Sequence, residues 1–252
     1  MKIKEHKGLM FPEDIEYQYS NKLKKIVRVM EKKLTELVTR KKNDSSNDNE
    51  YEQEFLDYMG EYLSNEFCLG IAVDYSTQAV QYAITQVNNQ VDKVAGINIK
   101  KQFWYDEKKI KEQIKENVKL IKAEPNKYLR TYDKQVQKLV KQAAEEGLST
   151  KTLKEAIKLT TGIEDKRANL IARDQVGKIF AYATKTQFQG IGLKKFEWVT
   201  VGDNRVRDSH KERNGQIYEW DNPPSGEIPG SAIQCRCVAS IVESELIELY
   251  AA

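Results

Sequence analysis

The C-terminal stretch Trp198-Val199-Thr200-Val201-Gly202-Asp203-Asn204-Arg205-Val206-Arg207-Asp208-Ser209-His210 is the start of the segment that decides the fold. Asn214-Gly215, a Pro/Gly-rich loop over 221–230 and Cys235-Arg236-Cys237 follow it. One of the two histidines and two of the three cysteines of the chain fall in this window. Turn-forming residues between short apolar runs are typical of a small, loop-rich module.

The pattern within the window predicts three short antiparallel strands. Lys195–Val201 alternates as a strand, with Phe196 and Trp198 on one face, and Gly202 turns the chain. We expect one or two helical turns over 205–213, a tight turn at Gly215, and further strands over 216–220 and 234–240. The tail to Tyr250 is expected to be a short helix or coil. Trp198, Gly202 and Gly215 are therefore candidate structural residues.

The chain before this window is predicted to be helical. Apolar residues at three- and four-residue steps indicate helices over 16–42, over 51–95 with a break near Gly70, over 107–122 and over 127–146, then a short helix ending at Gly162 and another over 165–190. Pro125 and Gly147 are expected to end helices. Residues 41–50 contain no apolar side chain and indicate a loop, and 97–105 is expected to be extended or irregular.

These elements predict an α+β protein that is mostly α. We expect a helical arm or bundle over 1–160 and a compact C-terminal α+β module over 161–252. Arg173 interrupts the apolar face of the last long helix. We interpret Arg173 as a structural residue. The aliphatic part of its side chain would pack against its neighbours, and its guanidinium would donate hydrogen bonds to a loop carbonyl or carboxylate.

Composition limits the classes of function. The 252 residues include 41 basic and 38 acidic side chains, a net charge of +3, so no general attraction to nucleic acid is indicated. The sequence shows neither an apolar run of about 18 residues, as a membrane span requires, nor an apolar signal segment. We therefore expect synthesis in a cytoplasm. Three cysteines do not form a disulfide framework.

His210, Cys235 and Cys237 are candidate ligands of Zn²⁺. On a strand, the two cysteines would present both sulfurs on one face, and His210 could approach them. Two thiolates and an imidazole suit zinc, with Asp203, Asp208 or water as the fourth ligand. The alternative is structural: two small buried side chains, with His210 hydrogen-bonded to a loop. A disulfide within so short a loop would be strained.

Two further classes of function remain open. A hydrolase could use His210 with a thiol or a metal-activated water, but no glycine-framed nucleophile or carboxylate pair accompanies it, so we expect no enzyme. Non-specific DNA contact is suggested by a local excess of basic side chains. The two helices around 146–150 have the shape of a helix-turn-helix that could read DNA, and the alternative is an ordinary helical hairpin. The basic side chains are Arg205, Arg207, Lys211 and Arg213. The alternative is that they pair with local carboxylates.

The ordered motifs resemble the C-terminal module of the phage Mu F-like minor head proteins, also called the phage head morphogenesis family. The resemblance begins weakly near Tyr128, is clear at Arg167–Val176 with its Ala-Arg-x-x-Val core, and continues through Cys237, about half of the chain. Two departures are Asp174-Gln175, where the family often has Thr-Glu or Ser-Glu, and a short Pro-Gly loop.

The resemblance implies a minor capsid protein of a tailed bacteriophage or prophage. Such a protein is made in the host cytoplasm and associates with the portal protein inside the procapsid. It would contact capsid or scaffold proteins, lie near the packaged DNA in the virion, and aid head assembly or DNA delivery. The alternatives are a metal-dependent nuclease or toxin-type effector that uses the His/Cys cluster, and a non-specific DNA-binding protein.

Overall fold

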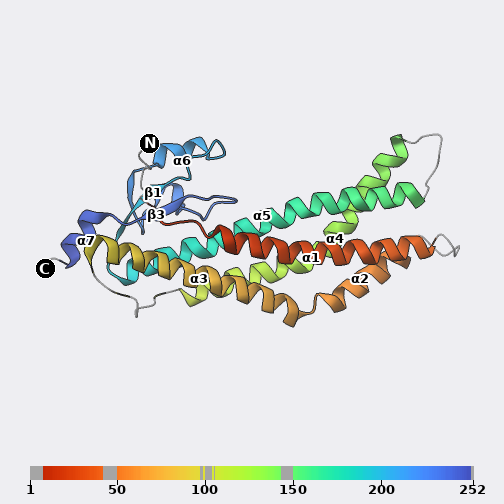
Figure 1. The fold of residues 1–252 in the computed structure, drawn as a ribbon, viewed down its shortest axis with the longest axis horizontal. Helices are drawn as coiled ribbons and strands as arrows, with labels where there is room; N and C mark the ends of the chain where they lie inside the picture. Colours follow the sequence, from red (N-terminus) through yellow and green to blue (C-terminus); the bar gives the residue numbers. More distant parts are fainter. Residues whose placement is uncertain are drawn as a thin grey trace. The chain divides into compact units, whose positions relative to one another are not determined.

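A computed structural model describes residues 8–41, 50–96, 99, 104, 106–142 and 150–250. Its elements in chain order are α1 (Glu13–Lys41), α2 (Glu50–Tyr62), α3 (Asn65–Ala95), α4 (Glu107–Gln142), α5 (Thr150–Gly190), β1 (Lys195–Val199), α6 (Asp208–Arg213), β2 (Ile217–Glu219), the 3₁₀ turn η1 (Pro224–Gly226), β3 (Val238–Ser240) and α7 (Glu243–Tyr250). Figure 1 shows these elements coloured along the sequence. The predicted class, α+β and mostly α, is confirmed.

The helix break expected near Gly70 is wrong, because α3 runs without interruption from Asn65 to Ala95. The break falls earlier, where Ser64 accepts a hydrogen bond from the Phe67 N–H at 3.2 Å. A serine that bonds the third following amide is a typical helix N-cap. A glycine inside a helix costs only about 1 kcal/mol, which the burial of neighbouring Cys68, Ile71 and Ala72 offsets.

Two pairs of expected helices are single helices. Pro125 lies inside α4, and Gly162 lies inside α5. Proline removes one intrahelical hydrogen bond and costs about 3 kcal/mol, yet its neighbours Ile121, Tyr128 and Leu129 are buried and hold the helix together. The expected stop at Gly147, the turn of the candidate helix-turn-helix and most of 97–105 lie outside the described residues.

Contacts between Cα atoms divide the chain into two compact units. One unit holds the residues up to Glu16, Val73–Ile114 and Arg173 onward, and the other holds Tyr17–Ala72 and Lys115–Ala172. The predicted domain boundary at residue 160 lies within α5 and stays a prediction.

The described residues of the second unit are almost entirely helical and are built around the apolar stripe of α1. All seven stripe residues predicted from spacing are buried: Leu23, Ile26, Val27, Met30, Leu34, Leu37 and Val38. Phe55 of α2 stacks on Tyr128 of α4 with ring centroids 6.1 Å apart. The Tyr128 hydroxyl lies 2.8 Å from that of Thr161 on α5. This unit is therefore a helical bundle with a few buried polar contacts.

The first unit contains the sheet, whose strand order is β2-β1-β3 with both pairings antiparallel. Phe196 pairs with Tyr218, and Trp198 with Ala239. Phe196 and Trp198 are fully buried, as their alternation predicted. The third strand is shorter than the expected 234–240, since it begins only at Val238.

Segments from distant parts of the sequence complete the core of the first unit. The Leu9 N–H donates to the Ala239 carbonyl at 3.2 Å, so the start of the described chain lies against β3. Gln90 of α3 donates to the Ser240 hydroxyl at 2.9 Å. Glu245 of α7 accepts from the backbone amides of Lys194 and Lys195 at 2.9 and 3.1 Å. Among the described helices, none is both long and apolar enough to cross a membrane.

Candidate metal and anion site

The loop that carries both cysteines packs tightly against α5. A Cβ added at Gly177 of α5 would lie 3.4 Å from the Cys235 carbonyl oxygen and 3.3 Å from Phe11. Gly230 has φ +87°, and a Cβ there would lie 3.2 Å from that of Ala181. Glycine is suited to both demands, close approach and positive φ. The two glycines thus let the loop before β3 lie directly on the helix.

His210, Cys235 and Cys237 meet in one cluster, as the sequence analysis suggested. The Nδ1 atom of His210 lies 3.5 Å from each of the two Sγ atoms. All three residues are buried, and their ligand atoms lie within 4.8 Å of one another. The expected strand conformation of the two cysteines was wrong, because both residues lie in a loop. Cys237 folds back so that its N–H points to the Cys235 sulfur at 3.4 Å.

The imidazole contacts Glu227 and Trp198, and Arg213 holds both of these residues. Its Nε2 lies 3.5 Å from a carboxylate oxygen of Glu227. Arg213 fixes the same oxygen at 2.9 Å and also stacks over the Trp198 ring at 4.9 Å. The Trp198 ring meets the imidazole edge-on, with centroids 5.1 Å apart. Hydrogen bonding by Arg213 lowers the pKa of Glu227, so this carboxylate stays ionised beside the histidine.

The two thiols behave as a coupled pair. A hydrogen bond from Cys237 lowers the pKa of Cys235, with help from the backbone amides of Cys237 and Gly230 and against the effect of burial. The pKa of Cys237 is raised by the same hydrogen bond and by burial. The pair therefore loses one proton easily and holds the other, and metal ligation would require both to leave.

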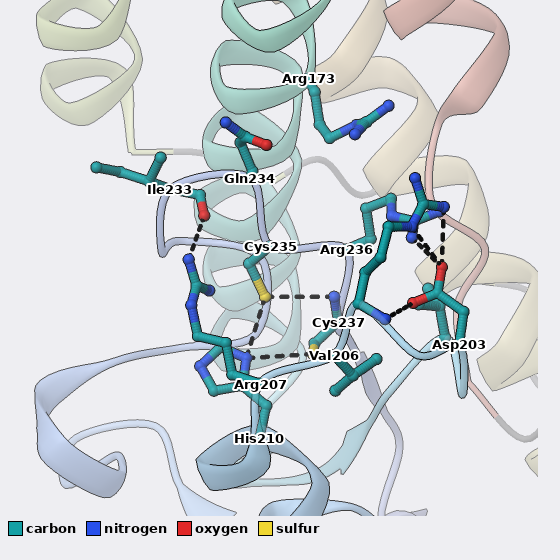
Figure 2. A pocket seen from close by; sticks show the side chains of 12 residues that line it. Arg173, Asp203, Val206, Arg207, His210, Ile233, Gln234, Cys235, Arg236 and Cys237 are labelled. Carbon is teal, nitrogen blue, oxygen red and sulfur yellow. Dashed lines mark hydrogen bonds and ion pairs between the residues drawn. The ribbon is translucent and has the colours of Figure 1, made fainter.

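A pocket of about 280 Å³ opens beside the cluster, and all three cluster residues line it. Four arginines and one carboxylate, Asp203, line it, and Figure 2 shows Arg173, Arg207, Arg236 and Asp203 around it. The arginines are Arg173, Arg205, Arg207 and Arg236. This lining carries an excess of positive charge, which is a feature of anion sites.

Each arginine of the pocket is held by a protein oxygen. Asp203 binds Arg205 at 2.9 Å and also binds Arg236. Arg207 donates to the Ile233 carbonyl at 2.7 Å, and Arg173 bonds the Glu16 carboxylate at 2.9 Å. Although desolvation acts to raise it, hydrogen bonds from Arg236 and Arg205 lower the pKa of Asp203. The guanidinium groups are thus fixed in position.

The remaining candidate residues lie apart from the cluster. Asp203 and Asp208 are not in the group of three within reach of one metal ion, and the exposed Asp208 pairs with Lys211 at 2.8 Å. Of the four candidate DNA contacts, only Arg205 and Arg207 line the pocket. Gly202 and Gly215 have φ of +74° and +75°, as turn residues would.

Sequence reasoning missed Glu227 and Arg236. Glu227 lies in the Pro/Gly loop, where no periodic pattern indicates which side chain turns inward. Arg236 lies between the two cysteines in the sequence, and this position is the feature that could have identified it as a site residue. Its partner Asp203 was predicted as a candidate metal ligand, not as the partner of an arginine.

Comparison with known proteins supports the resemblance seen in the motifs. A family model described as "Phage Mu protein F like protein" matches residues 134–240. An uncharacterized protein of Haemophilus influenzae is 43% identical over 123 residues, which are 48% of this chain and 27% of that protein. The chain thus spans about a quarter of the length of this relative. No solved structure matches the chain.

Proposed function

Because the chain is a phage Mu F-like protein over residues 134–240, we propose that it is a minor head protein of a tailed bacteriophage or prophage. In this role it joins the procapsid, associates with the portal protein inside the head, and aids head assembly or DNA delivery. It is made in the host cytoplasm and then carried in the virion.

The observation that carries the proposal is where the family match falls. The matched residues include α5, the whole sheet, α6 and the loop with both cysteines. They therefore include the full His/Cys cluster and its arginine-lined pocket, the most distinctive chemistry in the described chain. The shared segment thus carries the candidate site, which a head protein can present to portal or capsid partners.

The test is quantitative mass spectrometry of purified particles from the phage or the induced prophage. We expect the protein in procapsids and virions at low copy, in a fixed ratio to the portal protein, with the host lysate as the reference. A particle lacking the portal should also lack this protein. Absence from both procapsids and virions would overturn the proposal.

A second candidate function, non-specific contact with packaged DNA, is favoured by the pocket. Four arginines against one aspartate give a local excess of positive charge on a chain that is nearly neutral overall. Arg205 and Arg207 are both exposed, and the Arg205 side chain is 64% exposed. Phosphate contacts of this kind bind without reading sequence.

The DNA contact would appear as salt-dependent binding to duplexes of unrelated sequence. Replacing Arg205 and Arg207 by Gln should weaken binding to all duplexes alike and reduce the salt slope by about 1 for each phosphate that is no longer neutralised. Lys211→Gln is the matched control, since Lys211 lies outside the pocket and pairs with Asp208. Equal weakening in the control and in the pocket variants would exclude a pocket-based contact.

We propose a non-enzymatic role for the His/Cys cluster. A nuclease or toxin function requires that His210→Ala abolish an activity while the protein stays folded. The proposed role requires instead that the same change lower the melting temperature or incorporation into particles. Plasmid-nicking assays on the wild-type protein and the variant, read beside thermal melts, separate the two.

A further inference from the structure

We propose that His210, Cys235 and Cys237 form a zinc site that fastens α6 to the loop before β3. Nδ1 of the histidine and the two thiolate sulfurs are the protein ligands. The fourth position faces the arginine-lined pocket and takes an oxygen ligand, water in the simplest case.

The interatomic distances fit a tetrahedral ion. A Zn–S bond of about 2.3 Å and a Zn–N bond of about 2.0 Å at the tetrahedral angle place nitrogen and sulfur about 3.5 Å apart. Nδ1 of His210 lies 3.5 Å from both Sγ atoms. Both nitrogen–sulfur distances thus match such a site, and all three ligand atoms lie within 4.8 Å of one another.

A single metal ion would account for the equal distances of the two sulfurs from Nδ1. A neutral imidazole offers one lone pair on Nδ1, which can accept one thiol proton, and the Cys237 thiol bonds Cys235, yet both sulfurs lie at the same distance from Nδ1. Both cysteines are also buried. An ion at the common centre would bond all three atoms at once.

Glu227 supplies the support that histidine ligands of zinc usually have. Its carboxylate lies 3.5 Å from Nε2 and is itself held by Arg213. A proton on Nε2, turned to a carboxylate, leaves the Nδ1 lone pair free for the metal and makes it more basic. Glu227 is therefore a positioning residue of the proposed site.

The pocket explains why the protein offers three ligands. His210, Cys235 and Cys237 all line it, so a small ligand can approach the ion from there. Asp203, the carboxylate of the pocket lining, is bound by Arg205 and Arg236 and is not grouped with His210 and the two cysteines as a possible metal ligand. The four arginines would favour an anionic oxygen over a neutral one.

The first experiment measures metal in the full-length protein, purified under reducing conditions from zinc-supplemented cells. We expect about one zinc per chain, as a site of this ligand set implies. After removal by a chelator, Co²⁺ should produce the near-ultraviolet charge-transfer bands of two thiolates and the visible bands of a four-coordinate ion. A metal-free protein that gives no such cobalt spectrum would overturn the proposal.

Variants then locate the ion. Cys235→Ser and Cys237→Ser should each lose the bound zinc and the two-thiolate spectrum. Cys68→Ser is the matched control, because Cys68 is the third buried cysteine and its thiol donates to the nearby Leu63 carbonyl, away from the cluster. Full zinc retention in the Cys235 and Cys237 variants would contradict the assignment, as would equal loss in the control.

Glu227→Gln tests the positioning role without removing a ligand. Loss of such a carboxylate typically weakens metal binding by about 10- to 100-fold, so the zinc dissociation constant should rise by that factor while the cobalt spectrum keeps two thiolates. Unchanged affinity would show that Glu227 does not position the histidine. If a ligand variant fails to fold, the wild-type cobalt spectrum alone still decides between the outcomes.

Discussion

Glu164 on α5 is a buried carboxylate whose polar contacts offset only part of its lost hydration. Its side chain is 4% exposed, and Thr131 donates to one oxygen at 2.8 Å. Arg167 reaches the other oxygen only at 3.9 Å. Burial is the main reason that the pKa of Glu164 is raised. The charged form is therefore disfavoured in the folded state more than in the unfolded chain.

This residue makes stability depend on pH in a defined direction. Since the folded pKa exceeds the unfolded one, Glu164 contributes stability below its unfolded pKa and loses that contribution as pH rises through the folded pKa. We expect Glu164→Gln to unfold at a higher urea concentration than wild type near neutral pH. The advantage should vanish on acidification to about pH 4.5, the ordinary value for glutamate.

Urea unfolding curves across this range check the prediction, with the exposed Glu36→Gln as control. The control should show no comparable pH-dependent difference. An advantage of Glu164→Gln that persists unchanged in acid would mean that the carboxylate charge is not its cause.

The residues of the candidate site differ in how far the sequence could predict them. His210 and the two cysteines could be grouped because each residue type is rare in this chain. Glu227 could not, since it is one of many acidic residues and reaches the histidine from a loop without periodicity. Its contact depends on how η1 and Arg213 place the loop, which is tertiary information.

At the scale of elements, the buried faces of the helices were predicted correctly, but several of the helix ends were not. The stripe of α1 is buried throughout, because a 3.6-residue period directly specifies one face. Breaks assigned to Gly70, Pro125 and Gly162 are wrong. Each of these residues destabilises a helix interior by about 1–3 kcal/mol. The burial of apolar side chains along a long helix stabilises it by more than that.

The two glycines of α5 should therefore respond oppositely to alanine. A Cβ at Gly162 meets nothing within 4 Å, so Gly162→Ala should raise the free energy of unfolding by about 0.5–1 kcal/mol. A Cβ at Gly177 meets Phe11 at 3.3 Å and the Cys235 carbonyl at 3.4 Å. Gly177→Ala should forfeit this gain and disturb the cysteine loop.

Chemical denaturation of both variants gives the comparison. We expect Gly162→Ala to exceed Gly177→Ala by about 1 kcal/mol or more. Equal stabilisation by the two changes would show that the loop does not rest on α5 as closely as the structure indicates.

At the scale of the whole molecule, the segment shared with the family does not contain its own core. The core of the first unit includes Leu9, Phe11, Val87 and Val91, which precede the matched residues, and Leu246, which follows them. Sequence patterns predicted the sheet but not this surrounding chain, since such long-range packing leaves no local periodicity.

A fragment of residues 134–240 alone should therefore be unfolded or molten. It would expose the faces of Phe196 and Trp198 that the missing segments help to bury, and it would leave the Lys194 and Lys195 amides without Glu245. Amide NMR spectra of the fragment and the full chain provide the measurement. A dispersed spectrum from the fragment would show that it folds independently.

The contact between α6 and the cysteine loop has a consequence for proteolysis. The segment 211–234 begins directly after His210 and ends directly before Cys235, and these two residues are in contact. Both ends of the segment are therefore held at the same place. A protease that cut within the Pro/Gly loop would sever the polypeptide without releasing either piece. The nicked protein would elute as a single species on a native column and separate into two bands only after denaturation.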